Sequence, residues 1–261
     1  MIDLISSLKY IVVLMNFIII YVLKKAKNKA KPDSAATNKA AEACLLLIAH
    51  PDDESMFFVP LIQNLKYKGY KVHVLCLSNG GSKIREDELK KAATVLNIDK
   101  LKICNLEDKG IVDGMNKKWN NSVIFSEIIE YCTNEEIKAL FTFDKYGVSG
   151  HLNHIALYNT VGDNIDKFKG INIYTLESVN ILRKFISILD FFSVAVFELY
   201  LVVYDFLKDT TRSDNHFSFF NFNFLLNIQA MKAHRSQFVW FRKLFVGFSR
   251  YTYINTFKRI N

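Results

Sequence analysis

Residues 45–54 read LLLIAHPDDE, a run of five apolar residues followed by a histidine, a proline and three acids. Such a run without charges predicts a strand that is buried on both faces, as in a parallel sheet with helices on either side. The polar residues then leave the carboxyl end of that strand. Ligands bind at this end of the strands in open α/β sheets. The stretch therefore predicts a fold class and, with it, the position of a binding site.

The same kind of apolar run recurs along the chain and alternates with longer segments of helical periodicity. The further strand-like runs are residues 72–77, 101–105, 139–143 and 171–176. The segments with helical periodicity are residues 54–68, 85–96, 121–132 and 154–167. This alternation predicts a Rossmann-like three-layer α/β fold, in which a mostly parallel sheet is covered by helices on both faces. Three polar segments follow such strands, and we expect them to converge at one edge of the sheet; they are residues 49–54, 78–85 and 144–154.

An apolar segment at residues 4–23 predicts an N-terminal transmembrane helix, because about 20 such residues span a bilayer. Lysines crowd the stretch after it, namely Lys24, Lys25, Lys27, Lys29 and Lys31. By the positive-inside rule these lysines place the following residues on the cytoplasmic side. A cleaved signal peptide is the alternative, but the charge lies where its cleavage site would be, which favours an uncleaved anchor. We therefore expect an anchor (residues 1–23), a basic linker (24–43) and a globular domain with a membrane-associated C-terminal part (44–261).

The whole chain has a net charge of +8, and positive charge is also concentrated near its C-terminal end. No Asp or Glu follows Asp214, whereas several basic residues do, namely Lys232, Arg235, Arg242, Lys243, Arg250, Lys258 and Arg259. Because they are interleaved with aromatic residues, they suit an anionic membrane surface better than a nucleic-acid groove. We expect membrane lipids and no nucleic acid as partners. A solvated basic face is the alternative.

Residues 185–207 are strongly apolar but carry Asp190, Glu198 and Asp205. This spacing places the three acids near one face of a helix. An amphipathic helix on the membrane, or a buried hairpin element, is therefore favoured over a second membrane span.

Two short motifs at the predicted strand ends contain residues that bind metals. His50 and Asp53 follow the first strand, and His154 begins the helix after the fourth. Three such ligands leave one position open for water, which is the arrangement of catalytic zinc. The same donors suit other divalent metals, such as iron, cobalt or manganese. We expect Zn²⁺ at these three residues.

Polar residues next to these ligands complete a set for hydrolysis. Asp52 is a candidate general base toward the attacking water. His151, if protonated, is a candidate to stabilise the oxyanion that forms when an amide carbonyl is attacked. Each motif has a plainer explanation, since HxxH pairs often lie on helix surfaces and acidic runs often begin helices. Their shared place at one edge of the sheet favours the catalytic interpretation.

Three segments taken together resemble a known family. AHPDDE after a buried strand, LSNG with Arg85 and Glu86 following, and FDKYGVSGHLNH are similar to the zinc-dependent GlcNAc de-N-acetylase family. Its eukaryotic branch acts on a phosphatidylinositol-linked sugar, and its bacterial members include deacetylases of thiol biosynthesis. GVSGHLNHIAL and AHRSQFVWFRKLFVGFSRY resemble the eukaryotic branch more closely. The resemblance covers about residues 45–253.

The resemblance implies the same metal ligands, the same general base, Asp52, and the same group that stabilises the oxyanion, His151. It adds three candidate substrate-binding residues. Arg85 would contact the substrate phosphate, because a guanidinium binds phosphate with two hydrogen bonds. Asp144 would orient His151, with a turn-forming aspartate as an equal alternative. His234 would line the sugar pocket, unless it is a structural histidine. Many relatives carry proline where Leu152 stands, which puts the local rigidity in question.

The resemblance also implies a reaction and a cellular place. The chain would remove acetyl from GlcNAc-phosphatidylinositol in glycosylphosphatidylinositol (GPI) anchor synthesis, as a single-pass endoplasmic reticulum protein whose catalytic domain faces the cytoplasm. The sequence names no protein partner. One alternative is a metal-dependent deacetylase of another acetamido-sugar conjugate. The other is a non-catalytic membrane scaffold, which predicts the loss of a ligand or of the base, whereas all are present.

Overall fold

The computed structural model describes residues 42–186, 188–208 and 215–261. The chain divides into two compact units, one of residues 41–191 and 213–261 and another to which the described residues 192–208 belong. The predicted anchor and nearly all of the basic linker lie outside the described residues. No helix within the described residues has both the length and the apolar character that crossing a bilayer requires.

A seven-stranded sheet forms the centre of the larger unit, with the strand order β3-β2-β1-β4-β5-β7-β6. Its parallel strands are β1 (Ala43–Ile48), β2 (Lys71–Cys76), β3 (Lys100–Ile103), β4 (Ala139–Phe143) and β5 (Asn172–Leu176). They coincide with the predicted strands to within about two residues at each end, the usual scatter of strand limits. Every residue of β1 is buried, as its uninterrupted apolar run predicts. The predicted, mostly parallel sheet is confirmed.

The sequence pattern does not predict the last two strands of the sheet. β7 (Ile254–Arg259) pairs antiparallel with β5 and with β6 (His216–Phe220). The side chains of Ile254 and Phe257 are fully buried, so the end of the chain contributes to the core. Part of the aromatic, basic C-terminal segment is therefore sheet.

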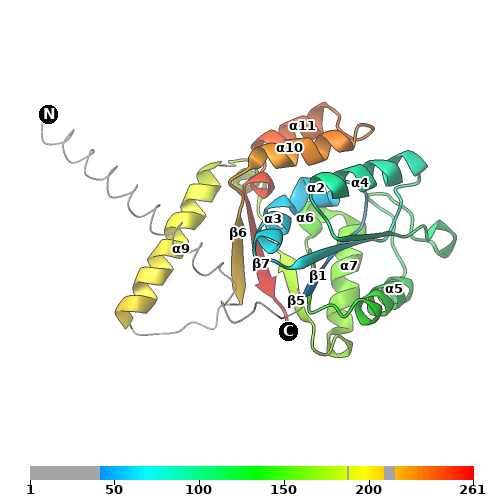
Figure 1. Ribbon diagram of the computed structural model, residues 1–261, viewed down its shortest axis with the longest axis horizontal. Coiled ribbons are helices and arrows are strands. Elements are labelled where there is room, and N and C mark those ends of the chain that lie inside the picture. Colours follow the sequence, from blue (N-terminus) through cyan, green and yellow to red (C-terminus); the bar gives the residue numbers. More distant parts are fainter. Residues whose placement is uncertain (1–41, 187, 209–214) are drawn as a thin grey trace, which may run out of the picture. The chain divides into compact units, whose positions relative to one another are not determined.

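Helices cover both faces of the sheet (Figure 1). On one face lie α3 (Val59–Tyr67) and α4 (Lys83–Val95), and on the other α5 (Asn121–Asn134) and α7 (Leu152–Asp163). This arrangement follows from right-handed crossovers between parallel strands, because the chain moves along the sheet in one direction first and then in the other. The predicted three-layer α/β architecture is confirmed.

The helix predicted at residues 54–68 is interrupted. α2 (Asp53–Phe57) is followed by the cap residue Phe58, and α3 has Pro60 in its first turn. Proline has no N–H with which to continue the hydrogen-bond ladder of α2, although it suits the first turn of a new helix. The break leaves α2 as a short helix that begins at Asp53.

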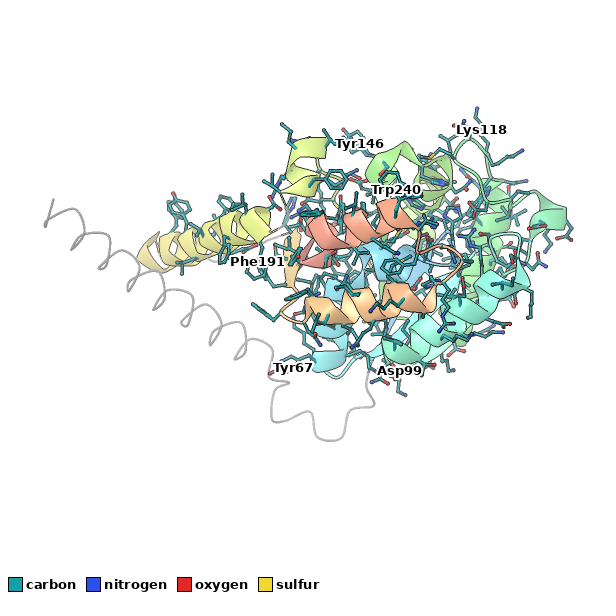
Figure 2. The ribbon with its side chains drawn as sticks, turned by 90° about the horizontal axis from the view of Figure 1, so that it is seen from above. Tyr67, Asp99, Lys118, Tyr146, Phe191 and Trp240 are labelled. Atoms are coloured by element: carbon teal, nitrogen blue, oxygen red, sulfur yellow. The ribbon has the colours of Figure 1, made fainter. Side chains whose placement is uncertain are left out.

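The C-terminal third adds four longer helical segments. They are α8 (Ile181–Phe185), α9 (Ile188–Lys208), α10 (Phe224–Ala233) and α11 (Trp240–Phe248), and the short η3 (Arg250–Thr252) follows them. The short helices earlier in the chain are η1 (Glu107–Lys109), α6 (Gly147–Gly150) and η2 (Ile165–Lys167). α9 is one continuous helix, so the hairpin alternative for residues 185–207 is wrong. α10 packs against α2, α4 and α11. Figure 2 shows α10 and α11 side by side above the sheet.

The strand order reverses between β1 and β4. The connections that leave the carboxyl ends of these two strands therefore diverge, at the place where such sheets usually bind their ligands. Two of the three predicted polar segments, residues 49–54 and 144–154, begin at this switch point.

Candidate metal centre and active site

The turn after β1 is closed by the carboxylate of Asp53. Its Oδ2 accepts hydrogen bonds from the backbone N–H groups of Ala49 at 3.0 Å and His50 at 2.9 Å. The other oxygen, Oδ1, faces the ring of His154, whose Nε2 lies 3.2 Å away. One carboxylate therefore shapes the turn and also presents an oxygen to the site.

The ring of His154 is held firmly at the start of α7. It stacks on Phe143 with ring centroids 3.8 Å apart, and its Nδ1 donates a hydrogen bond to the carbonyl of Gly147 at 3.1 Å. That donation leaves the lone pair on Nε2. Nε2 is buried and takes part in no hydrogen bond among the described residues, and its lone pair faces the carboxylate oxygen Oδ1 of Asp53. A buried polar atom without a partner is costly, and here it is placed as a metal ligand would be.

His50 completes the group from the β1 side. Its Nδ1 lies 3.7 Å from Asp53 Oδ2, and its Nε2 lies 2.9 Å from Asn153 Oδ1 and 3.2 Å from Asp113 Oδ1. Burial lowers the pKa of His50, but hydrogen bonding to Asp53 and the charges of Asp53 and Asp113 outweigh burial and raise the pKa to about 9. The acidic surroundings that favour a protonated imidazole also favour a metal cation.

The predicted metal ligands are brought together. Ligand atoms of His50, Asp53 and His154 all lie within 4.8 Å of one another, and all three residues are buried. Two imidazole nitrogens and one carboxylate oxygen match catalytic zinc sites and also suit other divalent metals. Because the lone pair of His154 Nε2 faces the Asp53 carboxylate without a hydrogen bond, this donor set fits a divalent metal.

A second group of residues meets the same distance criterion. It consists of His50, Asp113 and His151, of which only His50 is buried. Asp113 is paired with the guanidinium of Arg85. Because that carboxylate already has a cationic partner, the buried group fits a metal better.

Asp52 lies beside the ligands in an unusual backbone conformation. Its φ is 123°, a region that costs a residue with a side chain about 1–3 kcal/mol. Its N–H donates to Glu54 Oε2 at 3.2 Å, and its Oδ2 lies 2.8 Å from Arg242 Nη2. Burial raises the pKa of Asp52 to about 6, although Arg242 and Arg85 oppose the rise. A carboxylate with a pKa near neutrality suits a general base.

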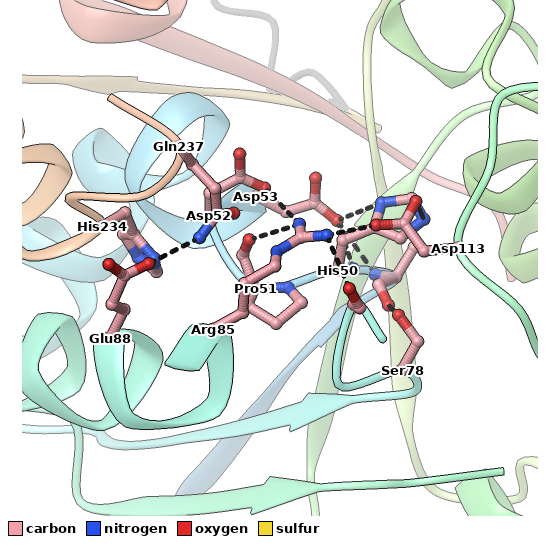
Figure 3. A network of polar contacts seen from close by, with 12 residues as sticks. His50, Pro51, Asp52, Asp53, Ser78, Arg85, Glu88, Asp113, His234 and Gln237 are labelled. Carbon is pink, nitrogen blue, oxygen red and sulfur yellow. Dashed lines mark hydrogen bonds and ion pairs between the residues drawn. The ribbon is translucent and has the colours of Figure 1, made fainter. Parts of the chain in front are cut away.

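Arg85 reaches the site from the first turn of α4 (Figure 3). Nη2 donates to the carbonyl of Pro51 at 3.0 Å, and Nη1 contacts Asp113 and the carbonyl of Gly80 at 3.2 Å. Gly80 has φ +67°, and a Cβ there would lie 2.4 Å from the guanidinium. Only glycine allows this close approach. The second polar segment, residues 78–85, thus joins the other two, as predicted.

His151 precedes α7 and stacks on His154 with ring centroids 4.6 Å apart. Its Nδ1 accepts a hydrogen bond from the N–H of Asn153 at 3.3 Å. Burial and the neighbouring His154 and His50 lower the pKa of His151 to about 4. The ring is therefore neutral near pH 7 in this structure, and the proton on Nε2 remains free to be donated. His151 would therefore stabilise an oxyanion by a hydrogen bond from its neutral Nε2–H group. The sequence suggested a protonated, positively charged ring instead.

Asp144 organises the loop before α7. Its Oδ1 accepts hydrogen bonds from the N–H of Gly147 at 3.1 Å and the hydroxyl of Ser178 at 2.6 Å, and its Oδ2 from the N–H of Ser178 at 2.7 Å. Gly147 in turn holds His154 through its carbonyl. These contacts match the turn-forming alternative, and Asp144 acts on His154 through the loop. Its contact with substrate stays a prediction.

His234, at the end of α10, is fully buried behind Asp52. Its Nε2 bonds Glu54 Oε1 at 2.7 Å, and Glu54 supports the N–H of Asp52. His234 is therefore linked to Asp52 through one residue. Its contact with a sugar stays a prediction, and the geometry suits a supporting role.

Three residues of the site were missed by the sequence reasoning. Asp113 follows β3 at the same edge of the sheet, so a polar loop after a strand was the available signal. Asn153 lies between the two histidines; its Oδ1 accepts from the N–H of Gly114 at 3.2 Å, and its Nδ2 donates to the carbonyl of Lys117 at 2.7 Å. Arg242 comes from α11, and no local pattern connects it with Asp52.

The leucine between the two histidines is compatible with a well-held loop. The N–H of Leu152 donates to the carbonyl of Met115 at 3.3 Å. Proline could not form this hydrogen bond. The contact ties residues near Asp113 to the start of α7.

Comparison with known proteins finds relatives along most of the chain. The family model for GlcNAc-PI de-N-acetylase matches residues 45–164. A probable N-acetylglucosaminyl-phosphatidylinositol de-N-acetylase of Schizosaccharomyces pombe is 36% identical over 230 residues, covering 84% of this chain and 88% of the relative. The N-acetylglucosaminyl-phosphatidylinositol de-N-acetylase of Bos taurus is 31% identical over 248 residues, covering 91% of each chain.

The fold is also similar to that of solved structures. The N,N'-diacetylchitobiose deacetylase from Pyrococcus horikoshii, complexed with its inhibitor MPG, superposes with a TM-score of 0.55 at 15% identity. The match covers 91% of this chain and 92% of the other. At this identity the likeness concerns the α/β fold alone.

Proposed function

Because the chain belongs to the GlcNAc-PI de-N-acetylase family, we propose that it hydrolyses the N-acetyl group of GlcNAc-phosphatidylinositol to GlcN-phosphatidylinositol and acetate, a step of GPI-anchor biosynthesis. The observation that carries the proposal is the buried group of His50, Asp53 and His154 with Asp52 beside it. The group lies at the switch point of the sheet, where a substrate can enter.

The donor set supports a divalent metal, for which we propose zinc. His50, Asp53 and His154 would hold it, and the buried lone pair of His154 Nε2, which faces the Asp53 carboxylate without a hydrogen bond, is the observation that favours this assignment. When bound, such a metal supplies a Lewis acid that polarises an amide carbonyl and acidifies water.

Asp52 and His151 would carry the proton transfers and the hydrogen bond to the oxyanion. With a pKa of about 6, Asp52 is mostly ionised at neutral pH and accepts a proton from the attacking water. The N–H at Nε2 of His151 donates to the oxygen that becomes negative. Asp52 then returns its proton to the nitrogen of the sugar as the bond to the acetyl carbon breaks. Acetate and a free amine result.

Two guanidinium groups beside Asp52 favour an anionic substrate. Arg85 and Arg242 both lie within ion-pair distance of this carboxylate. A guanidinium binds a phosphodiester with paired hydrogen bonds. We assign Arg85 to the substrate phosphate, as the resemblance implies.

The proposed place of the protein is the endoplasmic reticulum membrane, with the catalytic domain facing the cytoplasm. The names of the relatives support a GPI-anchor step. The lysines that follow the apolar N-terminal segment support the orientation.

Acetate release by the purified full-length chain tests the function. We expect turnover of GlcNAc-phosphatidylinositol that is lost on chelation and restored by added zinc, with metal content measured in the same samples. Soluble GlcNAc-inositol phosphate, which lacks the acyl chains, serves as a comparison. Equal turnover of both substrates would favour another acetamido-sugar conjugate. Full activity after complete metal removal would contradict the metal-dependent mechanism.

A further inference from the structure

α11 presents two different faces. Its inner face carries Arg242, which reaches Asp52, and Phe245, which packs on Phe57 with ring centroids 5.5 Å apart. Its outer face carries large apolar side chains that are 51–72% exposed, namely Trp240, Phe241, Leu244 and Phe248. These positions form one stripe along the helix. A surface helix of a soluble domain normally turns its single apolar stripe inward, so the outer stripe calls for an apolar partner.

An open cavity of about 650 Å³ lies between α10 and α11, on the side of α11 that carries Lys243 and Gly247. Lys232, Arg235 and Lys243 line it, together with apolar residues such as Ile228 and Phe238. None of these three cations has an acidic partner among the residues that the structure describes. The chain also has no Asp or Glu after position 214. The cavity is therefore positively charged with apolar walls, which suits a phosphate attached to acyl chains.

We propose that the outer stripe of α11 and this cavity form a docking face for an anionic phospholipid bilayer. The exposed aromatic side chains enter the interface, and the cavity takes a lipid phosphate. Exposed aromatic residues next to basic residues, with no acidic residue among them, are the combination that binds anionic membrane surfaces. The inference rests on the proposed function, in which the substrate is held in such a bilayer.

The docking face is continuous with the candidate active site. Arg242 lies between Phe241 and Lys243 in the sequence, and its guanidinium turns inward to Asp52 at 2.8 Å. α8 extends the apolar surface, since Ile181 and Leu182 are 71% and 78% exposed. Phe185 of α8 contacts Phe245 of α11 with ring centroids 6.0 Å apart. A bilayer on this face would let a lipid-linked sugar reach the site while its acyl chains stay in the membrane.

Tryptophan fluorescence can test the docking directly, because the chain has 2 tryptophans. Trp240 is 72% exposed, whereas Trp119 is 7% exposed. The full-length chain is placed in vesicles of phosphatidylcholine and phosphatidylglycerol, with or without bromine on the acyl chains. The apolar segment expected at residues 4–23 would hold every variant on the vesicle, so the readout must be local to α11. We expect brominated chains to quench the wild-type emission and to have little effect on Trp240→Phe. Equal emission in both kinds of vesicle would overturn the proposal and leave the face to a protein partner.

Charge reversal tests the cavity. Lys243→Glu should weaken the quenching, since each basic residue near an anionic surface changes binding roughly fivefold. Removal of phosphatidylglycerol should weaken it in the wild type as well. Lys169→Glu, an exposed lysine before β5, is the matched control and should quench as the wild type does. If quenching changes neither in Lys243→Glu nor when phosphatidylglycerol is removed, the cavity does not bind a lipid phosphate.

Turnover separates failure of the docking from failure of the proposed function. Leu244→Asp should lower hydrolysis of GlcNAc-phosphatidylinositol in vesicles about tenfold, as a loss of about 1.4 kcal/mol of interfacial binding implies. It should leave hydrolysis of soluble GlcNAc-inositol phosphate unchanged. Tyr67→Asp, at the exposed end of α3, is the control and should alter neither. An equal fall on both substrates, or on neither, would count against docking. A wild type inactive on both substrates would refute the proposed function while the quenching result still stands.

Discussion

The carboxylate of Asp52 is under opposing influences. Burial favours its neutral form, whereas the guanidinium groups of Arg242 and Arg85 favour the charged form, and the outcome is a pKa of about 6. Its backbone conformation, with φ 123°, is held by Glu54, which accepts the Asp52 N–H and is itself bonded to His234. A strained residue that is fixed from several sides is typical of a functional site.

Replacing Asp52 with Asn should nearly abolish deacetylation. An amide of the same shape cannot accept the proton, so we expect kcat to fall at least about 100-fold, the usual contribution of a general base. Metal content and the circular dichroism spectrum should be unchanged, because Asp52 is not among the proposed ligands. Asp108→Asn, in the exposed short helix η1, is the control. Normal turnover by Asp52→Asn would refute the proposed base.

A buried carboxylate of α4 ties down the loop that precedes α11. Glu88 of α4 accepts hydrogen bonds from the N–H and hydroxyl of Ser236 at 2.8 and 2.6 Å and from the amide of Gln237 at 3.0 Å. The carbonyl of Gln237 accepts from Arg242 at 3.0 Å, and Arg242 reaches Asp52. The loop between α10 and α11 is therefore tied to the core at the point that places Arg242.

Replacing Glu88 with Gln should destabilise the protein in a pH-dependent way. Burial raises the pKa of Glu88, but the hydrogen bonds from Ser236 and Gln237 outweigh burial and hold the pKa below its usual value. A carboxyl whose pKa is lowered by folding stabilises the protein above its unfolded pKa, about 4.3, and loses this effect as the pH falls through the folded pKa. The free energy of unfolding should therefore drop by about 2 kcal/mol at pH 7, and by less as the pH falls from 5 to 3.

Urea unfolding in detergent across this pH range measures the difference between Glu88→Gln and the wild type. Asp87→Asn, exposed on the same helix, should cost little at any pH and serves as the control. A destabilisation that grows as the pH falls would contradict the proposed sign.

At the scale of the whole molecule, the C-terminal strand holds the N-terminal half of the site. Asn255 of β7 is fully buried, and its side chain accepts from the N–H of Leu61 at 3.1 Å and donates to the carbonyl of Phe57 at 2.8 Å. These are the free backbone groups at the break between α2 and α3. Residues separated by nearly the whole described chain thus fix the end of α2, the short helix that begins at Asp53.

Replacing Asn255 with Leu should therefore destabilise the entire fold. It leaves a buried N–H and a buried carbonyl without partners, so we expect a loss of about 3 kcal/mol, at 1–3 kcal/mol for each group. Urea unfolding monitored by circular dichroism measures it. Asn159→Leu, exposed on α7, should stay within about 0.5 kcal/mol of the wild type. Equal stability of the two variants would refute the structural role of Asn255.

The amino-acid sequence by itself determined the parallel half of the sheet and the three grouped ligand candidates. Both depend on local pattern, because a buried strand is a short apolar run, and the polar residues after such strands must gather at one edge of a parallel sheet. The sequence alone therefore groups His50, Asp53 and His154, and the structure brings their ligand atoms together.

Only the tertiary structure decided what surrounds that group. The placement of Asp113 against His50, of Arg242 against Asp52 and of Asn255 at the break in α2–α3 joins residues far apart in the sequence, and no periodicity connects them. The antiparallel strand β7 follows an aromatic, basic segment whose sequence suits a membrane surface and a solvated basic face equally well. Its role follows from packing, because side-chain burial and pairing across the sheet are properties of the folded chain and not of any one segment.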